Sequence, residues 1–246
     1  MFFIGNRYFD VFDSPDFVAF TPQHFAALGG CVLIVGLLYL LRRPLQQGSR
    51  PRYMRWFLAS MLILCEVSLN VWYVSEGIFQ AKDTLPFELC SVTLYVAVIM
   101  LLTGNRRLFP FVYFAGIGGA LQAILTPVLG YGFPHYRYLE FFIGHLLIIL
   151  SALYMVWVEG LRPTLGSLFA AFGWLNVLLV PVWIVNRLTG GNYMFISRKP
   201  DTASLLDILG PYPWYLLSLE GVALLLFALL YLPFGLRSVK RAKTGH

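Results

Sequence analysis

The sequence predicts an all-α, polytopic membrane protein: a bundle of seven transmembrane helices with its N-terminus outside and its C-terminus in the cytoplasm. Hydrophobic residues make up 59% of the 246 residues and charged residues only 12%, whereas a soluble domain is about half apolar and a quarter charged. Mean hydropathy is +0.72. The apolar residues also gather into seven runs, each near the roughly 20 residues that cross a bilayer as a helix. Composition therefore excludes a disordered chain, a disulfide scaffold and an ordinary cytosolic enzyme.

Short segments with turn-forming or basic residues separate the seven runs. The first run opens with Thr21 as its expected N-cap and Pro22 at the first helical position. The later breaks contain Pro, Gly and Asn, which favour turns over continued helix. No internal repeat or low-complexity stretch is present, so we expect a single transmembrane domain. The expected spans are residues 21–41, 54–79, 85–103, 108–127, 138–160, 164–188 and 211–234.

The distribution of Lys and Arg sets the expected orientation. Cytoplasmic loops of membrane proteins carry an excess of these residues. With the N-terminus outside, twelve of the 18 basic residues fall on the cytoplasmic side, within the loops and a basic tail at residues 236–246. Residues 1–20 mix Phe with Asp and are expected to lie at the outer interface. The prediction is a multi-pass protein of the plasma (cytoplasmic) membrane.

Polar residues inside the predicted spans gather in the outer half of the bundle. Ionisable side chains are costly in the hydrocarbon region and mark a working site by default. The inner halves of several spans are almost entirely Leu, Ile, Val and Ala, so we predict a polar cavity that opens toward the outer leaflet. The residues expected at this depth include Glu88, Cys90, Gln122, Glu140, His145, Asn186 and Glu220.

Cys90 and His145 form the sharpest candidate pair for chemistry. A thiol nucleophile needs a base within hydrogen-bond reach, and the two residues are predicted at similar depths on different helices. The competing interpretation is that Cys90 is a small buried hydrophobe and that His145 locks the bundle by a hydrogen bond. Glu140 is five residues from His145, a poor spacing for orienting its ring, and is better placed to pair with Arg137 or Tyr136.

The sequence gives little support to other kinds of site. His24, His135 and His145 are expected near the outer side, but no tight zinc-ligand spacing links them, so no metal is predicted. No P-loop or dinucleotide fingerprint is present, and no cofactor is expected. The net charge of +6 comes from short basic clusters between apolar runs, which does not favour nucleic-acid binding.

Several polar sequence blocks are similar to those of a known family. They include Leu85-Pro86-Phe87-Glu88-Leu89-Cys90, Gly118-Gly119-Ala120-Leu121-Gln122-Ala123 with Thr126-Pro127, and Phe133-Pro134-His135-Tyr136 followed by Glu140 and His145. Further blocks are Thr189-Gly190-Gly191-Asn192-Tyr193-Met194-Phe195, Lys199-Pro200, Leu205-Leu206-Asp207 and Gly210-Pro211-Tyr212-Pro213-Trp214-Tyr215. The chain from residue 20 to residue 234 resembles the YwaF-like integral membrane proteins of bacteria, a family related to the animal acyltransferase called transmembrane protein 164. The resemblance implies a thioester on Cys90, with His145 as its base.

The combined hypothesis is a lipid-modifying enzyme that transfers or hydrolyses phospholipid acyl chains through Cys90 and His145. Gln122, Asn186 or Asn192 would donate hydrogen bonds to the oxyanion. The loop at residues 190–212 is long enough to be a functional lid, and Asn192, Tyr193, Lys199 and Asp207 would close over the headgroup. The alternative is a binding or transport protein that uses Glu88, Glu140 and Glu220 to hold a small molecule or a lipid. Membrane lipids are the expected partners in either case, and the sequence leaves the oligomeric state open.

Overall fold

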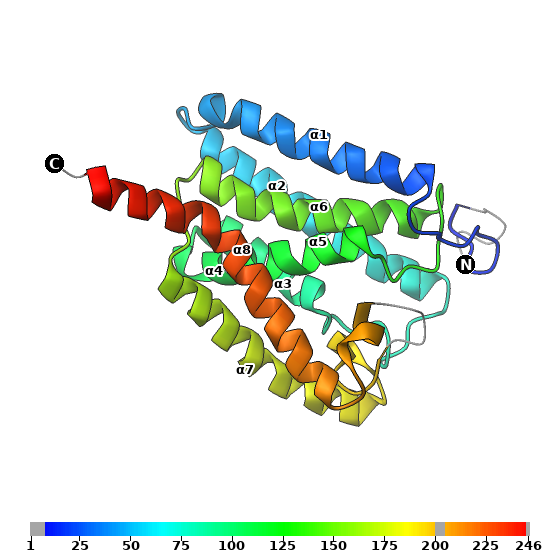
Figure 1. Ribbon diagram of the computed structural model, residues 1–246. Helices are drawn as coiled ribbons and strands as arrows, with labels where there is room; N and C mark the ends of the chain where they lie inside the picture. Colours follow the sequence, from blue (N-terminus) through cyan, green and yellow to red (C-terminus); the bar gives the residue numbers. More distant parts are fainter. Residues whose placement is uncertain (1–7, 200–204, 245–246) are drawn as a thin grey trace.

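The computed structural model describes residues 8–199 and 205–244, with side chains described as far as Leu236. Throughout this described part the regular structure is helical (Figure 1). Six helical segments are long and apolar enough to cross a membrane, and a seventh apolar helix is shorter. The predicted fold class, a polytopic helical membrane bundle, is confirmed. The helices are α1 (Pro22–Leu45), α2 (Arg50–Ser75), α3 (Leu89–Thr103), α4 (Phe109–Phe111), α5 (Ile117–Leu125), α6 (Tyr136–Trp157), α7 (Leu165–Thr189) and α8 (Trp214–Thr244).

One of the spans is built from four short pieces rather than one regular helix. A 3-10 turn (Arg106–Leu108), α4, a π-helical turn (Val112–Gly116) and α5 follow one another without a break. Together they make a 20-residue apolar span from Arg106 to Leu125. The π-helical turn is fully buried against α3 and α6. Such turns are rare and often lie near functional sites.

Helix α6 forms the centre of the bundle, and α1 forms an edge. In Figure 1, α6 runs between α1 and α2 on one side and α5 on the other. Most of α6 is buried, including Ile148, Tyr154 and Met155. By contrast, α1 exposes large apolar side chains such as Val32 and Leu33. Exposed apolar side chains on a membrane helix are accounted for by contact with lipid chains.

The ends of several helices differ from the sequence-based expectation. Helix α1 continues to Leu45, with Pro44 in its last turn. Helix α2 begins at Arg50 because Pro51 fits the first turn of a helix. It ends at Ser75 rather than residue 79, since Gly77 adopts φ 70°. Helix α8 continues to Thr244, so the stretch predicted as a basic tail at residues 236–246 is helical as far as residue 244.

Helix α3 differs most, and the difference shapes the site. It begins at Leu89 instead of residue 85, since Pro86 disfavours helix in the residue before it and Glu88 is extended. Its last residues lie beside Arg55 near the start of α2, because a Cβ on Gly104 would come 2.9 Å from the Arg55 guanidinium. At 1.5 Å per residue, α3 rises ~22 Å from there while α2 rises ~30 Å. Measured along the helix axes, the first turn of α3 therefore stops about 8 Å short of the end of α2. Cys90 and its neighbours thus lie inside the bundle.

The described part of the N-terminal segment caps one end of the bundle. The Trp72 indole donates to Phe9 O at 2.8 Å, and Tyr136 N donates to Tyr8 O at 2.7 Å. Gly132 N donates to Pro15 O at 2.6 Å, where a Cβ would lie 2.9 Å from two carbonyl oxygens. These contacts tie residues 8–16 to α2 and to the segment before α6. Residues 1–7 of the predicted interfacial segment lie outside the described residues.

Candidate functional site

A large pocket opens inside the bundle at the end where α3 begins. Its volume is about 1050 Å³, and helices α2, α3, α5, α6, α7 and α8 contribute to its walls. Of the site residues predicted from sequence, it brings together Cys90, His145, Gln122, Glu88, Glu140 and Glu220. The pocket therefore combines these polar side chains with apolar walls from α7 and α8.

Cys90 lies in the first turn of α3, where helix geometry leaves backbone amides free. The first α3 amide to bond a helical carbonyl is Val92 N, which donates to Glu88 O at 3.0 Å. Glu88 is the N-cap residue, but its side chain makes no capping hydrogen bond. The amides of residues 89–91 thus have no partner within the helix. A helix N-terminus carries partial positive charge, so this turn favours a negative group in the pocket.

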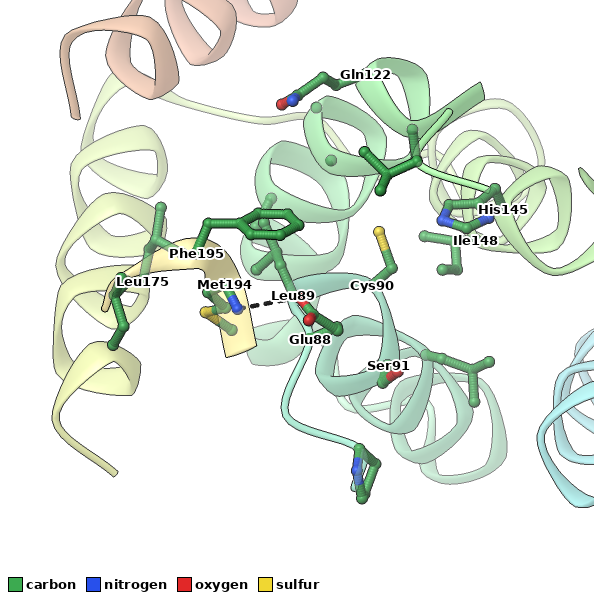
Figure 2. A pocket seen from close by; sticks show the side chains of 18 of the residues that line it. Glu88, Leu89, Cys90, Ser91, Gln122, His145, Ile148, Leu175, Met194 and Phe195 are labelled. Carbon is green, nitrogen blue, oxygen red and sulfur yellow. Dashed lines mark hydrogen bonds between the residues drawn. The ribbon is translucent and has the colours of Figure 1, made fainter. Parts of the chain in front are cut away.

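The Cys90 sulfur points into the pocket on the side where the His145 ring lies (Figure 2). Gly119 provides room beside the sulfur, because a Cβ at that position would lie 3.6 Å from Cys90 Sγ. Nδ1 of His145 bonds to Phe141 O at 2.6 Å. A carbonyl oxygen only accepts, so Nδ1 carries the hydrogen and Nε2 is left as the acceptor. This tautomer is the one a general base requires.

Glu140 pairs with Arg137, as its spacing predicts. The Arg137 guanidinium donates to a Glu140 carboxylate oxygen, and both side chains line the pocket. Tyr73 faces the same cation, with the guanidinium 5.8 Å from its ring centre. Since both ions are largely buried, Arg137 and Glu140 balance each other's charge in this corner of the pocket.

Glu88 is directed at a loop instead of at Cys90. One carboxylate oxygen accepts a hydrogen bond from Met194 N at 3.0 Å (Figure 2). Met194 and Phe195 have φ of 55° and 52°, a left-handed conformation that costs residues other than Gly about 1–3 kcal/mol. Tyr215 helps to hold this segment by donating its hydroxyl to Phe195 O. Met194 and Phe195 both line the pocket. Nothing in the sequence pattern predicted their left-handed conformation.

Gln122 and Glu220 line other parts of the pocket. In Figure 2 the Gln122 amide extends away from the Cys90 sulfur. Glu220 on α8 accepts a hydrogen bond from Asn176 on α7 at 3.1 Å. Every pocket carboxylate that the alternative transport hypothesis invokes therefore has a protein partner: Glu88 has Met194, Glu140 has Arg137 and Glu220 has Asn176.

The five remaining predicted residues lie outside the pocket lining. Asn186 is buried, and its side-chain amide both accepts from Tyr193 N at 2.8 Å and donates to Tyr193 O at 3.1 Å. The Asn192 side chain bonds backbone atoms of Ser197 and Arg198. These residues hold the loop in shape, and their partners are backbone atoms whose positions the sequence does not reveal. The residues outside the lining are Asn186, Asn192, Tyr193, Lys199 and Asp207.

Tyr193 and Lys199 also make contacts within and around this loop. The Tyr193 hydroxyl donates to Ala81 O at 2.8 Å and accepts from Leu85 N at 2.8 Å. Burial raises the pKa of this phenol, so it stays protonated at neutral pH. The Lys199 ammonium is 3.5 Å from Asp207 O. Tyr193 thus connects the loop after α7 to the segment that leads into α3.

The other two histidines that the structure describes, His24 and His135, bond backbone atoms. His24 accepts from Phe20 N at 3.0 Å and bonds Ile124 O at 2.8 Å, which joins the start of α1 to α5. His135 accepts from Arg137 N and bonds Asp10 O at 3.2 Å, and burial lowers its pKa. Within the described ranges, no group of three His, Cys, Asp or Glu side chains is placed to hold a metal ion.

The fold and the pocket define a class: a multi-pass helical membrane protein with a large pocket inside its bundle, lined by both polar and apolar side chains. The chain belongs to the TMEM164 family, whose model matches residues 19–231. It is 30% identical over 239 residues to a protein of Treponema pallidum (strain Nichols) described as uncharacterized, covering 90% of this chain and 92% of that protein. No solved structure matches the chain.

Proposed function

We propose that this protein transfers acyl chains of membrane phospholipids through a thioester on Cys90, with His145 as the proton-transfer group. The observation that carries the proposal is a thiol in the first turn of a helix that begins inside the bundle, sharing a pocket with a histidine whose Nδ1 is committed to Phe141 O. A nucleophile and a base that line one pocket, with the N-terminal amides of a helix beside the nucleophile, are the parts that acyl transfer needs.

The first half-reaction would form the thioester. Cys90 Sγ attacks the ester carbonyl of a phospholipid while its proton passes to His145 Nε2. The carbonyl oxygen becomes an oxyanion and accepts hydrogen bonds from the free amides at residues 89–91. When the C–O bond breaks, His145 returns its proton to the leaving lipid alkoxide. The product is an alcohol, the lysolipid, and the acyl group stays on sulfur.

The second half-reaction reverses these roles. The hydroxyl of an acceptor lipid, or water, gives its proton to His145 Nε2 and attacks the thioester carbonyl. The C–S bond breaks, and the sulfur recovers its proton from His145. The apolar surfaces of α7 and α8, including Leu179 and Phe227, would contact the acyl chain during both steps. The same machinery supports acyl transfer with a lipid hydroxyl and hydrolysis with water.

The alternative hypothesis of a transporter has less support. Transport coupled to carboxylates requires groups that exchange partners, and the three candidate carboxylates are each bonded to a protein group. The Arg137–Glu140 pair also lies largely buried. No observation in the pocket favours transport over covalent chemistry.

Detection of the thioester tests the proposal. The purified protein would be incubated with a diacyl phospholipid carrying an alkyne-tagged chain, and its intact mass and tag content measured before and after hydroxylamine. We expect acylation of the wild type that hydroxylamine removes, none in Cys90→Ser, and formation slowed by about 100-fold or more in His145→Ala.

Cys65→Ser is the matched control, because Cys65 is another membrane-helix cysteine but does not line the pocket. It should acylate as the wild type does. Hydroxylamine-sensitive acylation that persists in Cys90→Ser, or lipid turnover that is unchanged in that variant, would overturn the proposal.

A further inference from the structure

Arg137 supplies a positive charge to a pocket that is otherwise rich in carboxylates. Among the described residues of the pocket lining it is the one lysine or arginine. The acidic residues of the same lining are more numerous: Glu66, Asp83, Glu88, Glu140 and Glu220. An anionic group that enters the pocket needs a positive partner, because a buried unpaired charge is strongly unfavourable. In the described lining, Arg137 is therefore the place where an anion can be neutralised.

The Arg137 guanidinium has hydrogen-bond donors to spare. A guanidinium carries five N–H groups in a planar fork. Within the described residues, the Glu140 carboxylate is its hydrogen-bond partner, and that bond uses Nη1. The Tyr73 ring faces the same guanidinium, and the Tyr73 hydroxyl has no hydrogen-bond partner among the described residues although Tyr73 lines the pocket. A guanidinium fork with a phenol hydroxyl beside it suits the oxygens of a phosphate group.

The position of Arg137 along α6 matches the dimensions of a glycerophospholipid. Arg137 is eight residues before His145, about 12 Å along the helix axis. Its guanidinium reaches Glu140, which is five residues or about 7–8 Å from His145. The phosphorus of a glycerophospholipid is five or six bonds, or about 6–8 Å, from its ester carbonyls. A lipid with its phosphate at Arg137 therefore has an ester at the depth of His145.

This placement keeps the lipid in its normal bilayer orientation. Arg137 lies in the first turn of α6 and Tyr73 in the last turn of α2, at the end of the bundle that the N-terminal segment caps. Leu175, on the apolar wall of the pocket, is 14 residues or about 21 Å from Thr189 at the same end of α7. The headgroup thus lies toward the membrane surface and the chains toward the hydrocarbon core.

We propose that Arg137, together with the Tyr73 hydroxyl, binds the phosphate of the lipid substrate and so selects phospholipids over uncharged glycerolipids. The guanidinium donates to the phosphate oxygens while Nη1 keeps its bond to Glu140. Arg137 and Tyr73 determine specificity and do not touch the reacting atoms. The inference rests on the proposed function, because it concerns the substrate of the reaction at Cys90. The binding step is measurable without that reaction.

A comparison of two substrates tests the specificity. The full-length protein in detergent micelles receives either a diacyl phosphatidylcholine or the corresponding diacylglycerol, each with the same alkyne-tagged chain, and initial rates of Cys90 acylation are measured. We expect the wild type to prefer the phospholipid by about 10–100-fold, as one charge-assisted contact allows. Arg137→Gln should lower this ratio at least about tenfold. Tyr73→Phe, which keeps the ring, should lower it by about two- to tenfold.

Two further variants separate phosphate binding from support of the fold. Glu140→Gln breaks the ion pair but leaves the guanidinium in place, so the preference for phospholipid should be retained. Arg187→Gln removes an exposed arginine in the last turn of α7 that does not line the pocket, and it should leave the ratio unchanged. An equal loss of preference in Arg137→Gln and Glu140→Gln means that the pair only holds the pocket in shape, and overturns the inference.

Binding of lipids that cannot react separates this inference from the proposed function. A dialkyl phosphatidylcholine and a dialkylglycerol have ethers in place of esters, and each is titrated into Cys90→Ala while the melting temperature is followed. Stabilisation by the phospholipid above that by the dialkylglycerol, lost when Arg137→Gln is added, supports the phosphate site even in a protein that forms no thioester. Equal stabilisation by both lipids, or a difference that survives Arg137→Gln, overturns it.

Inorganic phosphate tests the other source of the same chemistry. Added in excess to Cys90→Ala, it should neither raise the melting temperature nor displace the dialkyl phospholipid, because it lacks the chains that the apolar walls contact. Stabilisation by inorganic phosphate that depends on Arg137 would assign the site to free phosphate and overturn its assignment to the lipid headgroup.

Discussion

Asn186 shows how a polar residue near a pocket can serve structure alone. Its side chain satisfies both the N–H and the C=O of Tyr193, and only 3% of the residue is exposed. Tyr193 in turn supports the strained Met194, whose amide bonds to Glu88. Conformational strain persists only where neighbours enforce it. The contacts of Asn186 therefore reach the pocket through the loop.

Removing this side chain should destabilise the loop. In Asn186→Ala both backbone groups of Tyr193 lose their partner, at a cost of about 1–3 kcal/mol for each. Asn186→Asp keeps the acceptor for Tyr193 N and should have an intermediate effect. Thermal unfolding followed by tryptophan fluorescence in detergent, with limited proteolysis of residues 190–199, measures both. An unchanged melting temperature and cleavage pattern in Asn186→Ala would contradict this role.

At the level of residues, side-chain pairs close together on one helix could be predicted from their spacing. Side-chain contacts with the backbone of an irregular loop could not. The Arg137–Glu140 pair follows from positions three apart on a helix. The partners of Asn186 and Asn192 are backbone atoms of an irregular loop, so their assignment to an oxyanion site had no structural basis in the sequence. For the same reason the free amides at residues 89–91 were missed as donors, because they depend on where α3 begins.

At the level of elements, hydropathy located the spans but not their ends. The apolar runs correspond to the observed helices, since a bilayer demands about 20 apolar residues whatever the neighbours are. Helix ends are determined by prolines, glycines and packing. Pro86 was available as a signal, and it would have placed Glu88 before the helix and Cys90 in its first turn. In the span from Arg106 to Leu125, Pro110 was a comparable signal for the break before α4, whereas the π-helical turn contains no proline.

The π-helical turn before α5 gives a test of close packing between elements. A Cβ on Gly116 would lie 2.7 Å from Thr93 Cγ2 and 3.1 Å from Ile148 Cγ2. Thr93 cannot easily move, because its hydroxyl donates to Leu89 O at 2.7 Å. Gly116→Ala should therefore separate this turn from α3 and α6 and destabilise the protein by about 1–3 kcal/mol.

Gly30→Ala is the matched control for this substitution. A Cβ on Gly30, within α1, would meet no heavy atom within 4 Å. Replacing a helical glycine by alanine then stabilises by up to about 1 kcal/mol. Melting temperatures of the two variants in the same detergent should move in opposite directions. If Gly116→Ala melts at or above the wild-type temperature, the contact of this turn with α3 and α6 is not tight.

At the level of the whole molecule, the two ends of the bundle differ in their polar groups. The end where α1 finishes and α2 begins carries Arg42, Arg43, Arg50, Arg52 and Arg55. The opposite end holds the described N-terminal segment, the pocket and the loop after α7. Arginine-rich ends remain in the cytoplasm during insertion. The pocket should therefore open on the outer side of the membrane, which would make outer-leaflet lipid its substrate.

Reporter fusions test this orientation. Alkaline phosphatase is active only after export and green fluorescent protein fluoresces when it folds in the cytoplasm, so a fusion after residue 246 should give fluorescence without phosphatase activity. Phosphatase fused after Gly130, in the segment between α5 and α6, should be active, and after Gly48, between α1 and α2, inactive. Replacing Arg42, Arg43, Arg50 and Arg52 by Gln should weaken the bias and produce mixed signals. An active phosphatase at the C-terminus, together with an inactive one after Gly130, would reverse the orientation and move the pocket to the cytoplasmic leaflet.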